Sequence, residues 1–262
     1  MKFIIRDDDL NYFSKPADIE RWYTDLFAER IPVGFSTIPF VTPKSDVYTG
    51  DTVPGGDEYP VSMNAELISY VKEHPLMEIL QHGTTHETVD GIYEYQNSGI
   101  EHDKTARGRA ELERAFDRSV RIFVPPHDWI GSKGIHSVEA AGMDIIRGRG
   151  AGLRNVVVRW EYLVVFAKAL AHKLLHASKG KVPAYPYVLD FGKHREACSY
   201  RLEDEDVFEG LEYTHQKDGI FVVVTHLHFY TDEKKDRLCA LIEKARSLDA
   251  SFVPPSALFP TR

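Results

Sequence analysis

Residues 3–10 read FIIRDDDL, which is three apolar residues, an arginine, three consecutive aspartates and a leucine. The apolar run at 3–5 predicts a buried strand. Like charges this close repel each other, and a buried carboxylate is costly unless a partner neutralises it. The three aspartates therefore indicate either a solvated turn, with Asp9 or Asn11 as a helix N-cap, or a cation bound at the end of a buried strand.

The length suits one large domain or two small ones, and because no convincing linker divides the chain we expect a single domain over residues 1–262. Of the 262 residues, 43% are apolar and 27% are charged, so a sizeable core is possible. The net charge of −8, without a block of lysine or arginine, argues against a nucleic-acid partner. The most apolar later stretch, roughly 155–177, contains Glu161, Lys168 and Lys173, so we expect no membrane span.

The cysteines and the first residues predict a cellular location. Cys198 and Cys239 are far apart and have no metal-ligand spacing, which is typical of a reducing compartment. Residues 1–7 contain no signal-peptide core, because charge arrives after three apolar residues. We therefore expect a cytoplasmic protein. Nothing in the sequence indicates its oligomeric state.

Short apolar runs alternate with amphipathic stretches along the chain, which is typical of parallel βαβ units. Residues 155–177 are ambiguous, with a strand followed by a helix as the expected order. Residues 42–60 predict a long loop that either covers a site or mediates contacts. The predicted helices cover residues 18–29, 64–73 with Asn64 as N-cap, 105–119, 135–141 and 232–247. The predicted strands cover residues 3–5, 31–38, 77–81, 121–124, 144–146, 188–190, 220–224 and 252–253.

Carboxylates and imidazoles follow five of these strands. Because the carboxyl ends of parallel strands meet at one edge, we expect these side chains to gather there. A chance distribution of 12 histidines would not place so many directly after strands. The residues concerned are Asp7–Asp9, His82 and His86, His127 and Asp128, Asp190 and His194, and His226 and His228.

His82 and His86 are four residues apart, so on one helical turn both imidazoles would point the same way and could chelate one cation. Alone, this spacing also fits two solvated histidines at a helix start. A carboxylate from the aspartate run would complete a site with two histidines and one carboxylate, and positions open for water and substrate. Together, the two motifs favour a metal site.

The order of these motifs resembles that of the NodB-like polysaccharide deacetylases, a family of metal-dependent carbohydrate esterases, and especially its divergent, shorter-motif branch. Family members carry an Asp-Asp pair after the first strand, an H-S/T-x-x-H motif, a Pro-rich strand end and a last strand that ends in histidine. Gly83 departs from this pattern, because the family usually has serine or threonine there. The matching residues are Asp8-Asp9, His82-Gly83-Thr84-Thr85-His86, Phe123-Val124-Pro125-Pro126 and Val224-Thr225-His226.

The resemblance implies a deformed (β/α) barrel of about seven parallel strands. It also implies one divalent cation, zinc in the first place and cobalt, manganese or nickel as alternatives. Asp9, His82 and His86 would be the metal ligands, and Asp8 would be the base that activates water. The implied reaction is hydrolysis of an N- or O-acetyl group on a sugar or polysaccharide, so a carbohydrate is the expected partner.

The remaining motifs imply further roles. The backbone N–H of His127 would contribute to an oxyanion hole, and His226 would be the general acid. Pro126 and Trp129 follow the same strand as His127 and are the expected substrate contacts. Trp129 would either stack on a sugar ring or line the rim of the site.

Several assignments stay open on the sequence alone. The family's first motif usually reads Asp-Asp-Gly, so Asp7 and Asp8 are an alternative pair, although the Arg-x-Asp-Asp-Val form of the divergent branch favours Asp8 and Asp9. His228 is an alternative acid to His226, because residues two apart on a strand face the same side.

The functions of three other polar residues are open as well. Asp190 and His194 either orient the catalytic histidine or are structural. Arg121 either corresponds to the arginine of the family's third motif or is a surface charge.

Two other functions are compatible with the same motifs, because a fold does not fix its substrate. One is hydrolysis of another amide, such as a ureide or a cyclic amide. The other is a non-catalytic carbohydrate-binding relative. Two departures from the family pattern keep it open, namely the aspartate run of the first motif and His127, where the family's third motif usually has an aromatic residue. A metalloprotease is disfavoured, because Glu87 follows His86 instead of lying inside the histidine pair.

Overall fold

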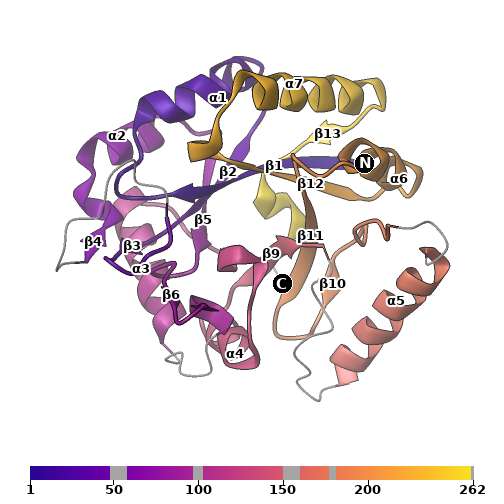
Figure 1. The fold of residues 1–262 in the computed structure, drawn as a ribbon, viewed down its shortest axis with the longest axis horizontal. Helices are drawn as coiled ribbons and strands as arrows, with labels where there is room; N and C mark the ends of the chain where they lie inside the picture. Colours follow the sequence, from indigo (N-terminus) through magenta and orange to yellow (C-terminus); the bar gives the residue numbers. More distant parts are fainter. Residues whose placement is uncertain (48–57, 97–102, 150–159, 177–180, 261–262) are drawn as a thin grey trace.

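Seven parallel strands form a closed barrel in the computed structural model, which describes residues 1–47, 58–96, 103–149, 160–176 and 181–260. The barrel strands are β1 (Lys2–Leu10), β2 (Val33–Thr37), β5 (Met77–His82), β8 (Ile122–Val124), β9 (Asp144–Gly148), β11 (Arg195–Arg201) and β12 (Ile220–His226). Their order is β11-β12-β1-β2-β5-β8-β9, and the parallel pairing of β9 with β11 closes the ring (Figure 1). The predicted (β/α) barrel of about seven strands is confirmed.

Helices cover the outside of this barrel, and short elements connect them to it (Figure 1). The α-helices are α1 (Pro16–Ala28), α2 (Ala65–Glu73), α3 (Lys104–Phe116), α4 (Ser132–Ala140), α5 (Trp160–His176), α6 (Val207–Gln216) and α7 (Asp232–Ser247). The 3-10 helices include η1 (Val61–Met63), η2 (Glu94–Gln96), η3 (Pro126–Asp128), η5 (Leu227–Phe229) and η6 (Pro255–Leu258). The short strands are β3 (Phe40–Val41), β4 (Tyr59–Pro60), β6 (Thr88–Val89), β7 (Ile92–Tyr93), β10 (Leu189–Asp190) and β13 (Ser251–Phe252).

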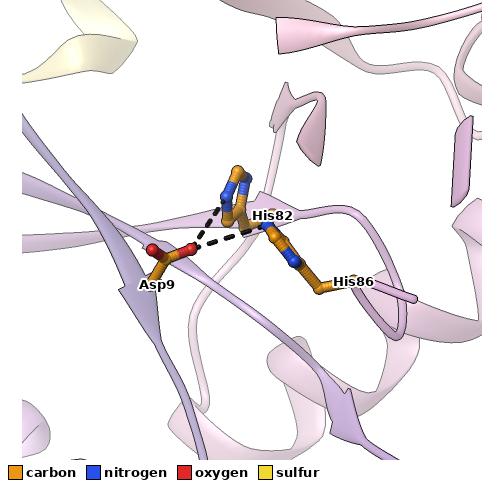
Figure 2. A group of neighbouring side chains, drawn as sticks. All are labelled: Asp9, His82 and His86. Atoms are coloured by element: carbon orange, nitrogen blue, oxygen red, sulfur yellow. Dashed lines mark ion pairs between the residues drawn. The ribbon is translucent and has the colours of Figure 1, made fainter. Parts of the chain in front are cut away.

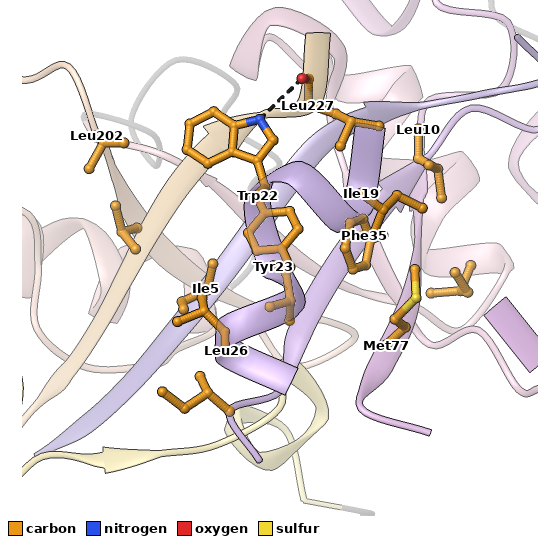
Figure 3. Close-up of a cluster of buried hydrophobic side chains, with 14 of the residues drawn as sticks. Ile5, Leu10, Ile19, Trp22, Tyr23, Leu26, Phe35, Met77, Leu202 and Leu227 are labelled. Carbon is orange, nitrogen blue, oxygen red and sulfur yellow. Dashed lines mark hydrogen bonds between the residues drawn. The ribbon is translucent and has the colours of Figure 1, made fainter. Parts of the chain in front are cut away.

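Alternate side chains of β1 face the two sides of the barrel wall. Phe3 and Ile5 point outward and belong to the large cluster beneath the helices. Figure 3 shows part of this layer, with Trp22 of α1 donating from Nε1 to the carbonyl of Leu227 at 3.2 Å. Ile4 points inward and belongs to the smaller cluster inside the barrel, with Leu80, Ile122, Val124, Ile146, Ala197, Val222, Leu258 and Phe259.

A segment late in the chain closes the amino end of the barrel. Leu258 and Phe259 reach the interior cluster from η6. A Cβ atom on Gly34 of β2 would lie 2.4 Å from Cγ of Pro255, so this close approach needs glycine. Lys2 donates from Nζ to the carbonyl of Ala257 at 2.8 Å, which ties the segment to β1.

The predicted elements differ from the structure in several places. β1 continues to Leu10, so the aspartates lie inside the strand and not after it. β11 was not predicted, because its sequence REACSYR has charged residues at both ends and no continuous apolar run, and helix α6 was not predicted either. Residues 160–176 of the ambiguous stretch 155–177 form α5, while its remaining positions lie outside the described residues, as do positions 48–57 of the expected loop.

Asp190 and His194 do not join the other predicted strand ends. They precede β11, and β10 pairs antiparallel with β11, so both residues lie at the amino end of a barrel strand. The expectation that they contribute to the same edge as the aspartate run is wrong. The cause is the unpredicted strand β11. Because Asp190 and His194 precede it, they lie at the amino end of the barrel and not at the carboxyl end.

His194 instead lies in a buried ionic cluster. Its Nδ1 lies 3.0 Å from a carboxylate oxygen of Glu139 on α4, and its Nε2 lies 3.0 Å from Glu196 on β11. Glu196 also pairs with Arg147 of β9 at 2.8 Å. Burial opposes protonation of His194, but the two carboxylates outweigh this effect and raise its pKa. The cluster joins α4, β9 and β11, so the structural alternative for His194 holds.

We expect the stability of the fold to depend on protonation of His194. Because its pKa is raised above the unfolded value near 6.5, its contribution is fully present below that value. The contribution is lost as the pH rises through the folded pKa. The free energy of unfolding should therefore fall between pH 6 and pH 9, and His194→Gln should lose about 3 kcal/mol at pH 6 and less at pH 9. Urea unfolding measures both.

His136→Gln is the matched control, because His136 is an exposed histidine on the same helix as Glu139. It should keep both the stability and the pH dependence of the wild type. An unchanged pH dependence in His194→Gln would contradict the role of the cluster.

Candidate functional site

The carboxyl edge of the barrel surrounds a cavity of about 500 Å³. The gathering of polar strand ends predicted from the sequence is confirmed here for four of the five strands. The cavity is lined by Arg6, Asp8, Asp9, Asp46, His82, His86, Pro125, His127, Asp128, Arg201, Glu203, Val224, His226 and Phe229.

Asp9, His82 and His86 form a tight group of potential ligand atoms in this cavity (Figure 2). Oδ1 of Asp9 lies 3.2 Å from Nε2 of His82 and 3.6 Å from Nε2 of His86. One ligand atom from each residue lies within 4.8 Å of the other two. Two imidazoles and one carboxylate are a donor set that suits zinc, with a coordination position left for water or substrate.

The hydrogen bonds and charges of this group fit a cation. Nδ1 of His82 lies 3.1 Å from the carbonyl of Val124, so Nδ1–H donates there and the Nε2 lone pair faces Asp9. Two lone pairs facing each other require a proton or a cation between them. Burial lowers the pKa of His86 to about 4, which keeps this imidazole neutral, as a metal ligand must be.

The pKa values of Asp9 and His82 depend on each other. Burial opposes ionisation of Asp9, but the hydrogen bond with His82 and the charges of both histidines outweigh it and lower the pKa of Asp9. Burial likewise opposes protonation of His82, but the hydrogen bond with Asp9 and the nearby carboxylates raise its pKa. A metal ion bound here would replace the proton between Asp9 and His82, because a histidine ligand must be neutral.

The backbone around the cavity adopts left-handed conformations that L-residues rarely use. The pairing of β1 with β2 shifts register between Asp7 and Leu10, and this bulge turns Asp9 toward the histidines. Such conformations cost roughly 1–3 kcal/mol each and persist where the surrounding structure fixes them. The cavity residues concerned are Asp9 (φ 73°), His86 (φ 54°), His127 (φ 54°) and Asp128 (φ 60°).

Glu94 of η2 holds the turn that carries His86. It is only 6% exposed, and Lys104 pairs with its Oε1 at 2.9 Å. This carboxylate satisfies a run of consecutive backbone donors and fixes the left-handed turn. The groups that donate to it are the backbone N–H of Thr84 at 3.0 Å and those of Thr85 and His86 at 2.9 Å each.

Gly83 begins the same turn, and its position explains the departure from the family motif. Its φ is +58°, and a Cβ atom there would lie 2.5 Å from both Oε2 of Glu94 and Cγ of Pro126. The Glu94 carboxylate occupies the space that a serine or threonine side chain would need. The position of the Glu94 carboxylate therefore requires glycine at position 83.

Asp8 lies beside the ligand group without belonging to it. Arg6 donates from Nη2 to Oδ2 of Asp8 at 2.7 Å, while Oδ1 is buried and has no hydrogen-bond partner within the described residues. Burial opposes ionisation of Asp8, but the charges of Arg6, His82 and His226 outweigh it and lower its pKa. The parallel register of β1 and β12 pairs Asp8 with His226, so both open into the cavity.

Asp7 lies on the opposite face of β1, away from the cavity. Its carboxylate accepts from the hydroxyl of Tyr23, from Oγ1 of Thr225 at 2.7 Å and from the N–H of Leu227 at 3.0 Å. Burial raises the pKa of Asp7 to about 7, although the hydroxyl donors oppose this rise. Of the two sequence registers, the geometry favours Asp8 and Asp9 as the pair that faces the site.

His228 and Asn11 are also placed outside the cavity lining. β12 ends at His226 and the chain turns into η5, so the strand alternation that would align His228 with His226 does not continue. Nε2 of His228 lies 3.3 Å from the carbonyl of Asp9. Asn11 also donates to that carbonyl, at 2.8 Å, and α1 begins later, with Lys15 as N-cap, so the helix N-cap interpretation of Asp9 or Asn11 is wrong.

The third motif is only partly at the site. The His127 ring lies in the cavity, stacked on Tyr93 with 4.1 Å between ring centroids. Pro126 is buried beneath Gly83, and Pro125 lines the cavity in its place. Trp129 is 37% exposed and is not part of the cavity lining. Pro126 and Trp129 were predicted to contact the substrate, but neither residue lines this cavity.

Sequence reasoning missed several residues that shape the site. Arg6 is visible in the opening stretch, and its spacing of two from Asp8 puts both on one strand face, which is the signal that could have identified it. Arg201 ends the unpredicted strand β11 and Glu203 follows it, while Glu94 follows the short, unpredicted strand β7, so none of the three belonged to a motif. Arg121 is exposed and donates to Ser119, which agrees with a surface charge.

Comparisons with solved structures show the same fold at low sequence identity. The Xyl-CE4 domain of a multidomain xylanase from the hindgut metagenome of Trinervitermes trinervoides aligns over 98% of this chain and 88% of its own, with 11% identity and a TM-score of 0.51. A polysaccharide deacetylase from Bacillus cereus aligns over 100% and 96%, with 10% identity and a TM-score of 0.50.

A CE4 family pseudoenzyme from Bacillus anthracis also aligns, over 98% of this chain and 65% of its own, with 13% identity and a TM-score of 0.50. No family model matches the sequence, and no curated protein matches it either. The chain therefore has the fold of the CE4 polysaccharide deacetylases, and the resemblance read from its motifs is confirmed at the level of the fold.

We expect the purified protein to bind about one zinc-like ion per chain, and His86→Ala to lose it, because removing one imidazole leaves two protein ligands. Elemental analysis after reconstitution measures this. His176→Ala is the control, since His176 is a buried histidine on α5 outside the cavity lining. Equal metal content in wild type and His86→Ala would contradict the ligand assignment.

Glu94→Gln should weaken zinc binding about 10- to 100-fold, because the amide nitrogen cannot accept from the turn that positions His86. Titration calorimetry measures the affinity. Glu111→Gln is the matched control, because Glu111 is equally buried at 6% exposure and accepts from the backbone of Ser62, away from the cavity. If Glu94→Gln binds zinc as tightly as Glu111→Gln, the turn does not depend on Glu94.

Proposed function

We propose that this protein is a metal-dependent deacetylase that hydrolyses an N- or O-acetyl group on a sugar or polysaccharide. The observation that carries the proposal is the Asp8 carboxylate beside the Asp9–His82–His86 group. Arg6 binds one of its oxygens, and the other has no hydrogen-bond partner among the residues that the structure describes. A carboxylate base next to a metal site is a common arrangement for attack of water on an acyl carbon. The CE4 fold supports a carbohydrate substrate.

Asp9, His82 and His86 would hold a divalent ion, zinc in the first place, which would polarise the acetyl carbonyl and lower the pKa of water. Asp8 accepts a proton from the attacking water through Oδ1, while Arg6 keeps the carboxylate ionised and fixes its orientation. The new bond forms between the water oxygen and the carbonyl carbon.

The leaving group takes its proton from the opposite strand. His226, paired in register with Asp8, donates a proton to the sugar nitrogen or oxygen as its bond to the acetyl carbon breaks. The backbone N–H of His127 donates to the carbonyl oxygen as negative charge develops on it. The products are acetate and the free amine or hydroxyl of the sugar.

The rim of the cavity suits a sugar ring. Phe229 is 50% exposed and offers an apolar face, while Arg201 and Glu203 offer hydrogen-bond donors and acceptors on the neighbouring strand end. These residues replace Trp129 as the candidates for contact with the carbohydrate.

A non-catalytic carbohydrate-binding role is the second candidate, because one of the proteins with the same fold is described as a pseudoenzyme. Such a protein would bind glycans without releasing acetate even when loaded with metal. A hydrolase of a ureide or cyclic amide would release ammonia or a ring-opened acid instead. A substrate panel with acetate and ammonia detection separates the three.

We expect Asp8→Asn to keep the metal and lose activity about 10²- to 10⁴-fold, because the amide cannot accept the proton from water. Metal content and acetate release from an acetylated oligosaccharide are measured on the same preparation. Equal loss of metal and activity would contradict the assignment of Asp8 as the base.

Asp7→Asn is the matched control, since Asp7 is the neighbouring carboxylate on the opposite face of β1. Its loss should affect stability, while acetate release per folded molecule stays near that of the wild type. If Asp7→Asn abolishes activity and Asp8→Asn does not, the other register of the aspartate motif is correct.

A further inference from the structure

Helix α5 has an apolar face on the outside of the molecule. Its inner face, with Tyr162, Val165 and His176, is buried, and Figure 1 shows the helix at the periphery beside β10. Seven large apolar side chains on α5 are exposed, among them Trp160 at 74%, Leu174 at 67% and Leu175 at 76%. The others are Leu163, Val164, Phe166 and Leu170, and the small residues Ala167 and Ala171 between them are exposed as well.

The spacing of these residues is that of a helix-pairing seam. Positions 160, 163, 167, 170 and 174 alternate steps of three and four, which aligns them along one side of a helix that packs against another helix. The charged residues Glu161, Lys168 and Lys173 lie beside this seam and not within it. An apolar stripe this long on a solvent-facing helix needs a partner.

The size of the face matches what a protein dimer requires. The seven side chains are 37–76% exposed, so on the order of several hundred Å² of apolar surface lies on this helix, against ~800 Å² that each partner buries in a standard interface. A two-fold dimer uses the same patch on both subunits. The apolar seam of α5 could therefore be buried against the same seam of a second copy, without a different protein. An antiparallel pairing also brings Glu161 near the end of the partner helix where Lys173 lies and opposes the two helix dipoles.

A lipid surface fits the same face less well. The chain has a net charge of −8, which would be repelled by an anionic leaflet, and the flanks of α5 carry only two lysines on its exposed side. Within the described residues, no helix has the length and apolarity to cross a bilayer.

We propose that the outer face of α5 is a docking surface for a second copy of this chain, with the two α5 helices packed antiparallel about a two-fold axis. No residue of α5 lines the cavity at the strand ends, so each subunit keeps its own site.

Sedimentation velocity of the full chain over a hundredfold concentration range tests the proposal. Wild type should sediment at twice the chain mass of 29.8 kDa. The double variant Leu163→Glu/Leu174→Glu should be monomeric, with dimer affinity reduced by about a hundredfold or more, since both positions lie on the seam. Met63→Glu is the matched control, because Met63 is an apolar residue of η1 that is 63% exposed and should leave the dimer intact.

Folding of each variant is checked by its circular-dichroism melting curve, which should match that of the wild type because all the substituted side chains are largely exposed. A monomeric wild type across the whole range overturns the proposal, and so does a double variant that still dimerises. Co-sedimentation of a monomeric wild type with phosphatidylcholine vesicles, lost in the double variant, would assign the face to a membrane surface instead.

Discussion

Three adjacent carboxylates near the end of one buried strand each need a different partner, and much of the site follows from how the structure supplies them. Asp7 points outward and accepts from two hydroxyls and a backbone N–H. Asp8 points inward and pairs with Arg6. A bulge then rotates Asp9 toward two imidazoles. No single environment could stabilise all three as ions, because their mutual repulsion would add to the cost of burial.

Closure of the barrel brings the aspartates and the histidines of other strands together in one site. The parallel register of β1 with β12 sets His226 opposite Asp8, and the pairing of β5 with β8 sets His82 beside Val124, whose carbonyl orients its ring. The positions of Asp8, His82 and His226 therefore depend on strand registers. His86 and His127 lie outside the strands, and the position of His86 depends on a turn that Glu94 holds through consecutive backbone donors.

Much of this arrangement could be predicted from the sequence, because periodicity and strand ends are local signals. The alternation of strands and helices predicted parallel βαβ units, and the family resemblance implied the barrel. The residues after four strands predicted the edge where Asp8, Asp9, His82 and His86 meet. The features that could not be predicted depend on contacts between residues far apart in the sequence. β11 is recognisable only through its partners β9 and β12, and without it His194 was assigned to the wrong end of the barrel. Glu94 lies outside every motif and accepts from backbone N–H groups inside the histidine motif, so no residue pattern in the sequence indicates its role.

The segment that closes the amino end of the barrel has a consequence for folding kinetics. β1 pairs with β12 and β13, and the interior beside Ile4 is completed by Leu258 and Phe259, so the first strand waits for residues more than 200 positions later. Contacts this distant in sequence are slow to form. Until they form, one edge of β1 has no partner and the apolar interior is open, which exposes the nascent chain to aggregation. Closure of the barrel, and with it assembly of the site, therefore has to follow synthesis of residues 220–259.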